Sequence, residues 1–259
     1  SLSLARGDQA SIINSTITGE GDCLIIASCM DASCDGTESV YLRNNILLGH
    51  TDFLQPFENT CLTYTEGFPG NPVDMNHSVI HNVKNDPCPV GSDDLCEDPK
   101  LAGMDLDAFN ARLLSNSPAI DGGASAQAPG DDFTGVSRPL DGDFDGTNRH
   151  DIGAHEYVHP LADSDGDGMG DGDEVVAGTD ATNRNAFFRI ETIRAEPEVC
   201  MGWEGISGRR YDVFAAPRVT GIWEAVAGAT NLPGADAGLW FTNAFPDEAR
   251  FFRLGVRNP

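Results

Sequence analysis

The chain has 259 residues, of which 40% are hydrophobic and 8% aromatic, so it is globular material rather than a disordered acidic tail. Its formal net charge of −25 argues against nucleic-acid binding, because phosphate backbones repel such a chain. No apolar run reaches the ~20 residues of a membrane-spanning helix. We therefore expect neither nucleic acid as a partner nor direct insertion into a membrane.

Short aliphatic runs separated by polar loops fill the first hundred residues, and three of them surround an asparagine. Asn14 and Asn44 are 30 residues apart, and Asn45 and Asn76 are 31 apart. A repeat of this length is typical of a solenoid, and stacked asparagines can cap backbone groups at the corners of a parallel β-helix. The alternative is an antiparallel sandwich in which the asparagines only form turns.

The rest of the chain divides by composition. Residues 107–114 read as a helical turn or a strand, and a short acidic link follows further on. After Phe187 come six or seven short runs of strand character that contain all three tryptophans, which predicts a small β-sandwich. The expected domains are 1–123 (last β-helix coils), 124–160 (closing segment), 161–185 (calcium-binding linker) and 186–259 (β-sandwich module).

Four sequence blocks follow one another between residues 98 and 157. They are Asp98-Pro99, SPAIDGG at 117–123, DFTG at 132–135 followed by Arg138-Pro139, and DIGAHEY at 151–157. In this order they resemble the C-terminal end of the choice-of-anchor Q family of exported bacterial proteins. The resemblance implies a right-handed, pectin-lyase-like parallel β-helix that this segment closes. It implies no single activity, because such folds carry adhesins, structural surface proteins and polysaccharide enzymes.

The acidic charge is concentrated. Residues 131–180 contain fourteen acidic side chains against two arginines, so metal binding is the first explanation to consider. Counted from Asp163, carboxylates occupy positions 1, 3, 5, 9 and 12 with glycine at 6, which is the spacing of an EF-hand-type calcium loop. A short helix at 174–177 is expected to carry the last ligand. The predicted ligands are Asp163, Asp165, Asp167, the carbonyl of Met169, Asp171 and Glu174.

The continuation at 178–183 resembles thrombospondin type 3 and related calcium-stiffened linkers, and the alternative is a merely solvated acidic linker. A weaker copy of the loop begins at Asp141. It keeps the first three acids and the glycine, but Arg149 stands at position 9 and Ile152 at position 12. Its alternative is an exposed acidic hairpin. The predicted ligands of this weaker calcium site are Asp141, Asp143, Asp145, Thr147 and Asp151.

Seven cysteines are present, without any CxxC pair, and six of them fall in the first 96 residues. In an exported protein this distribution indicates disulfides that staple loops, with Cys88–Cys96 the simplest pair and Cys200 left over in a strand. The alternative is a set of reduced thiols in a cytosolic protein.

Catalytic patterns are weak. The chain has no HExxH motif and no GxSxG elbow. Asp93 with Asp94 and Asp105 with Asp107 could serve glycoside hydrolysis, although solvated loops explain them better. A polysaccharide lyase of this fold would use Ca²⁺ and a basic residue, for which the coils offer Arg43.

The C-terminal aromatics admit a further alternative. Trp203, Trp223, Trp240 and Tyr211 could form a sugar-stacking platform, whereas tryptophans in strands more often belong to a core.

We expect an all-β protein in which parallel β-helix coils are followed by a calcium-binding linker and a β-sandwich. The expected role is that of a non-enzymatic, exported structural or adhesion fragment at the cell surface, with Ca²⁺ fixing the junction and extracellular polysaccharide or surface proteins as candidate partners. The alternatives are a β-helix polysaccharide lyase or glycoside hydrolase and a carbohydrate-binding module.

Overall fold

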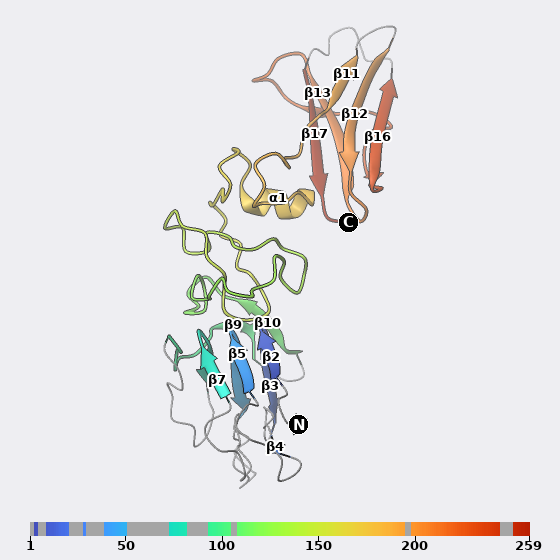
Figure 1. Cartoon of the computed structure of the whole chain (residues 1–259). Coiled ribbons are helices and arrows are strands. Elements are labelled where there is room, and N and C mark those ends of the chain that lie inside the picture. Colours follow the sequence, from blue (N-terminus) through green and yellow to red (C-terminus); the bar gives the residue numbers. More distant parts are fainter. Residues whose placement is uncertain are drawn as a thin grey trace. The chain divides into compact units, whose positions relative to one another are not determined.

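The computed structural model shows an all-β protein (Figure 1). It describes residues 3–4, 9–20, 28–29, 39–50, 73–81, 93–104, 108–194, 198–243 and 251–259. Within these ranges the one α-helix is α1 (Asp171–Ala177), and no described helix has the length and apolar character needed to cross a membrane. The chain forms two compact units, Ser1–Ser164 and Asp165–Pro259, which are described separately below.

Two parallel three-stranded sheets organise the first unit. Gln9 faces Ser39 and Val40 faces Val73, so the structural repeat is 30 and then 33 residues. The antiparallel alternative is therefore wrong for these strands. The first sheet contains β2 (Gln9–Ile13), β5 (Ser39–Arg43) and β7 (Val73–Asn76), and the second contains β3 (Thr16–Glu20), β6 (Ile46–His50) and β8 (Val79–His81). A further parallel pair joins β1 (Ser3–Leu4) to β4 (Ser28–Cys29).

A left-handed residue separates the two strands of each repeat. The φ angles of Asn14, Asn44 and His77 are 46°, 54° and 50°. Asn and His tolerate this region better than most residues. The predicted asparagine corners are thus confirmed at 14 and 44, whereas the third corner is His77. Asn76, which the spacing predicts there, is the last residue of β7.

Side-chain hydrogen bonds connect neighbouring corners. Asn44 Nδ2 donates to Asn14 Oδ1 (3.1 Å). Asn45 Nδ2 donates to the Ile12 carbonyl (2.8 Å) and Asn45 Oδ1 accepts from the Ser15 amide (3.1 Å). The two bonds of Asn45 satisfy backbone groups of Ile12 and Ser15, beside the first corner.

Residues 114–164, called the closing region below, contain isolated β-bridges rather than longer strands, and hydrogen bonds join them to the strand corners. The Gly153 amide donates to the Asn44 carbonyl (2.8 Å), and Asn14 Nδ2 donates to the Asp151 carbonyl (3.0 Å). Residues 107–114, predicted as a helical turn or a strand, contain the strand β10 (Asn110–Leu113), which pairs antiparallel with β9 (Leu101–Gly103). The shared core consists of Ile46, Leu48, Val79, Leu101, Leu113, Ala119 and Ile152.

Two antiparallel sheets build the second unit around one apolar core. The strand character expected from Phe187 onward begins, as a strand, only at Thr192. One sheet has β11 (Thr192–Arg194), β12 (Val199–Gly205) and β16 (Ala237–Asn243), and the other has β13 (Arg210–Ala216), β14 (Glu224–Ala225), β15 (Leu232–Pro233) and β17 (Phe251–Arg257). The buried core residues are Met201, Trp203, Tyr211, Val213, Val226 and Ala229.

The helix α1 belongs to this second unit. Arg209 Nη2 donates to the Val175 carbonyl (2.9 Å). A Cβ at Gly178, just after the helix, would lie 3.0 Å from Ile206 Cγ2. The segment from Asp165 onward is therefore anchored on the C-terminal sheets.

Of the seven cysteines, Cys29, Cys96 and Cys200 lie in the described residues. Cys96 is disulfide-bonded, and Cys200, in β12, is a free cysteine. Because Cys88 lies outside the described residues, its pairing with Cys96 stays a prediction.

Candidate metal centres

The acidic loop that starts at Asp163 gathers three carboxylates. One oxygen each from Asp163, Asp165 and Asp167 lie within 4.8 Å of one another. The Asp167 amide donates to Asp165 Oδ1 (3.0 Å), and the Met169 amide donates to Asp167 Oδ1 (2.7 Å). The backbone thus curls around its own side chains and turns the carboxylates toward a common point.

Two glycines make this curl possible. The φ angles of Gly166 and Gly168 are 73° and 98°. A Cβ at Gly168 would meet no atom within 4 Å, so the glycine is needed for its backbone conformation and not for space. This matches the role of glycine at position 6 of a calcium loop.

The helix α1 continues the loop and adds two acids. It begins at Asp171, three residues earlier than predicted, and ends before Gly178, whose amide donates to the Glu174 carbonyl (2.7 Å). Asp171 and Glu174 are separated by three positions, which places them on one helix face. Both are fully buried.

Glu174 is the most informative residue of the loop. Its Oε1 accepts a hydrogen bond from Thr179 Oγ1 (3.3 Å), whereas its buried Oε2 has no hydrogen-bond partner. Burial first, and then the charges of Asp165 and Asp167, raise the pKa of Glu174 to about 7. A cation among these oxygens would satisfy Oε2 and offset the repulsion.

All predicted ligands of this loop except Met169 offer a carboxylate, and hard oxygen donors are what Ca²⁺ prefers. Met169, predicted through its carbonyl, uses its amide to hold Asp167. Sequence reasoning missed Thr179 and Arg184, whose Nη2 donates to the Gly166 carbonyl (3.1 Å). Both lie beyond the twelve-residue spacing. Thr179 belongs to the continuation at 178–183, whose resemblance to calcium-stiffened linkers assigns it no role, and Arg184 follows that continuation.

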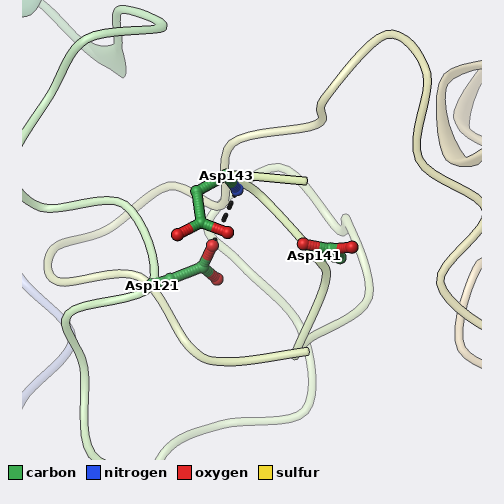
Figure 2. Close-up of side chains that lie close together, drawn as sticks. All are labelled: Asp121, Asp141 and Asp143. Carbon is green, nitrogen blue, oxygen red and sulfur yellow. Dashed lines mark hydrogen bonds between the residues drawn. The ribbon is translucent and has the colours of Figure 1, made fainter. Parts of the chain in front are cut away.

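A second acidic cluster forms in the first unit, and its composition differs from the predicted one. One oxygen each from Asp121, Asp141 and Asp143 lie within 4.8 Å of one another (Figure 2). Asp121 belongs to the SPAIDGG block, twenty residues before Asp141. Asp145 instead interacts with Thr147 and forms an ion pair with Arg149 at 3.2 Å.

Asp151, the last ligand predicted for this weaker site, instead accepts hydrogen bonds from backbone amides. It is 1% exposed. Its Oδ1 accepts from the Asp121 amide (2.8 Å) and its Oδ2 from the Tyr157 amide (2.5 Å). Burial raises its pKa well above the ordinary value, and the charge of Glu156 adds to the effect. Asp151 therefore holds two backbone segments of the closing region.

A buried ion pair connects two of the sequence blocks. Arg138 Nε lies 3.2 Å from Glu156 Oε2, and both side chains are almost completely inaccessible. Glu156 Oε1 accepts from the Leu140 amide (3.0 Å). Burial raises the pKa of Glu156 to about 7, although the Arg138 charge opposes this. The Arg-Pro and DIGAHEY blocks thus hold each other in the interior.

A cavity of about 700 Å³ lies beside the closing segment. It is lined by, among others, Asn110, Arg112, Phe133 and His155. His155 Nδ1 lies 3.5 Å from Asp132 Oδ2, which also accepts from the Glu156 amide (3.1 Å). Burial favours a higher pKa for Asp132, but the adjacent His155 ring first, and then the hydrogen bonds from the Val136 and Glu156 amides, lower that pKa below its usual value. Asp132 thus fixes the closing segment as well as facing the cavity.

The candidate catalytic residues have other partners. Asp94 is buried and its Oδ1 accepts from the Ser78 amide (2.9 Å). Arg43 donates to Asn76 and forms an ion pair with Asp74 at 3.3 Å. Asp105 and Asp107 lie outside the described residues.

Only part of the predicted aromatic platform lies at the surface. Trp203 and Tyr211 are 2% and 0% exposed and belong to the core of the second unit. Trp240 is exposed, and Trp223 lies under the guanidinium of Arg253, at 5.2 Å from its ring centre. Half of the predicted sugar-binding set is therefore core.

Comparison with known proteins adds no family to these observations. No protein-family model matches the chain, and no curated protein matches its sequence. The function is therefore inferred from the side chains themselves.

Proposed function

We propose that the chain is a calcium-stabilised structural part of an exported protein, extracellular or at the cell surface, and that Ca²⁺ binds in the loop Asp163–Glu174. The observation that carries the proposal is Glu174, whose buried Oε2 has no hydrogen-bond partner and whose pKa is raised by burial and then by the charges of Asp165 and Asp167. An anionic oxygen in this position is costly without a counter-ion. Calcium removes that cost.

The first unit supports a structural role. Its parallel sheets, its repeat of 30 and 33 residues and its asparagine corners fit the last coils of a right-handed parallel β-helix. The resemblance of residues 98–157 to the choice-of-anchor Q family favours the same fold. The second unit would be a β-sandwich module. Surface polysaccharide or other surface proteins are the partners such a fragment would meet.

Calcium binding would order the loop by mass action. A ligand that binds only the folded state stabilises it by about 2.7 kcal/mol at one hundred times its dissociation constant. For a unit of roughly one hundred residues each kcal/mol raises the melting temperature by about 4–8 °C. Millimolar calcium outside the cell would therefore keep the segment folded.

The test uses the full chain, stripped with EDTA and then titrated with Ca²⁺ while tryptophan fluorescence follows thermal unfolding. We expect Ca²⁺ to raise the melting temperature of the wild type by roughly 10 °C or more. Asp167→Ala and Glu174→Gln should lose most of this increase. Asp173→Asn, an exposed acid of the same helix, is the matched control and should keep it. Identical melting curves with calcium and with chelator would refute the proposal.

A further inference from the structure

Asp121, Asp141 and Asp143 also bring several carboxylates close together, in the first unit. Figure 2 shows the carboxyl groups of Asp121 and Asp143 close together, with that of Asp141 beside them. Asp121 and Asp141 are 9% and 7% exposed. Arg149, the basic residue of this loop, forms its ion pair with Asp145.

Asp121 supplies the decisive observation. Its Oδ2 accepts a hydrogen bond from the Asp143 amide (2.7 Å). Its Oδ1 is buried and has no hydrogen-bond partner. A carboxylate oxygen removed from water without a partner is destabilising unless something positive occupies the space in front of it.

The other two carboxylates are held in place and still have room for a ligand. Asp141 accepts the amide of Asp145 at Oδ1 and that of Gly146 at Oδ2, each at 2.9 Å. Asp143 Oδ1 also accepts the Asp145 amide (3.0 Å). A carboxylate has about four lone-pair sites, so these hydrogen bonds orient the oxygens without using all of them.

We propose that Asp121, Asp141 and Asp143 bind a divalent cation of the calcium class, separate from the Asp163–Glu174 site. Oxygen donors alone favour a hard cation over zinc. Two Ca²⁺–O bonds of about 2.4 Å span at most about 4.8 Å, which equals the limit within which the three oxygens lie. Asp121 takes the place of Asp145, Thr147 and Asp151 in the ligand set predicted for this weaker site, since Thr147 interacts with Asp145.

The ion would cross-link two segments of the closing region. Asp121 follows Ala119, which is fully buried in the core of the first unit, and Ile120, which packs against that core. A Cβ at Gly142 would lie 2.8 Å from Ile120 Cγ2, so the 141–146 loop approaches this turn closely. A cation held by both segments fastens the loop over the end of the core.

Calcium stoichiometry of the chelator-stripped full chain, measured by isothermal titration, tests this second site. We expect two calcium ions per wild-type chain. Asp121→Asn keeps the size of the side chain and an acceptor for the Asp143 amide but removes the charge, and should bind one ion. Asp143→Asn, at an exposed position, gives the same result if the buried variant folds poorly. Asp131→Asn, an exposed acid of the same region, should still bind two.

The two sites can fail independently. Glu174→Gln should also bind one ion, and Asp121→Asn combined with Glu174→Gln should bind none. If the wild type binds one ion that Glu174→Gln abolishes, the second site is overturned while the first stands. If Asp121→Asn and Asp143→Asn bind as many ions as the wild type, the second site is likewise overturned.

Discussion

Glu156 is a buried acidic residue of the first unit. It lies in the interior, where it forms an ion pair with Arg138 and accepts a hydrogen bond from the Leu140 amide. Burial raises its pKa to about 7 despite the arginine. Between the ordinary pKa of glutamate, 4.5, and pH 7, Glu156 therefore keeps a proton in the folded protein that it has released in the unfolded chain.

This pKa predicts how stability depends on pH. Between about pH 4.5 and 7 the folded state binds more protons at Glu156 than the unfolded state, so its contribution is fully present below pH 4.5 and is lost as the pH rises through 7. In EDTA we expect the unfolding free energy of the first unit to fall by on the order of 1–3 kcal/mol across this window. Denaturant titrations at pH 5 and pH 8 measure it.

Glu156→Gln is the comparison variant. The variant should be less stable at every pH, because Arg138 loses its buried ion-pair partner. Because glutamine does not titrate, the variant should lose less stability between pH 5 and pH 8. A remaining slope is expected because Asp151, beside it, also has a raised pKa. Equal slopes in both proteins would contradict the assignment.

At the level of the elements, side chains at the corners between strands connect neighbouring repeats of the parallel sheets. Asn44 is fully buried and its backbone is left-handed. Its Oδ1 accepts the Ala124 amide (2.7 Å) and its Nδ2 donates to the Ala124 carbonyl (2.7 Å) and to Asn14. One side chain thus joins two corners and the closing segment.

Replacing this side chain separates backbone strain from hydrogen bonding. Asn44→Ala should destabilise the first unit by about 3–5 kcal/mol, because it adds left-handed strain and leaves the partly buried amide and carbonyl of Ala124 unsatisfied. His77→Ala changes a corner with a similar φ, which is only partly buried, and should cost about 1–2 kcal/mol. Chemical denaturation measures both. Equal losses would show that the hydrogen bonds of Asn44 contribute little.

On the scale of the whole molecule, each unit has its own apolar core. The core of the first unit draws on the parallel strands and the closing segment, and the core of the second on two antiparallel sheets. All three tryptophans belong to the second unit. Tryptophan fluorescence therefore reports that unit alone.

We expect the full chain to unfold in two transitions in calorimetry, of which one coincides with the fluorescence change. Met201→Ala removes a 1% exposed side chain from the second core and should lower only the fluorescence transition, at a cost of about 2–5 kcal/mol. Leu48→Ala should lower only the other transition. A single transition that both variants shift equally would mean that the units unfold together.

The calcium-type loop shows how far local patterns reach. Ligand spacing, the glycine at 168 and the nearby helix depend on contacts within about twelve residues, and the structure gathers Asp163, Asp165 and Asp167 in one place. The asparagine corners are likewise visible as a repeat, because a solenoid places equivalent residues next to each other. The third corner was missed since its repeat is 33 residues long.

The amino-acid order alone determined the strand-rich class, the thirty-residue repeat at the asparagine corners and the glycine-directed curl of the acidic loop, because these follow from local backbone preferences and short-range spacing. Only the tertiary structure decided that Asp121 joins Asp141 and Asp143, that Asp151 supports backbone amides and that Trp203 is core. Partners twenty or more residues apart meet through the packing of whole segments. Burial, which sets the cost of each charge, exists only once those segments have folded together.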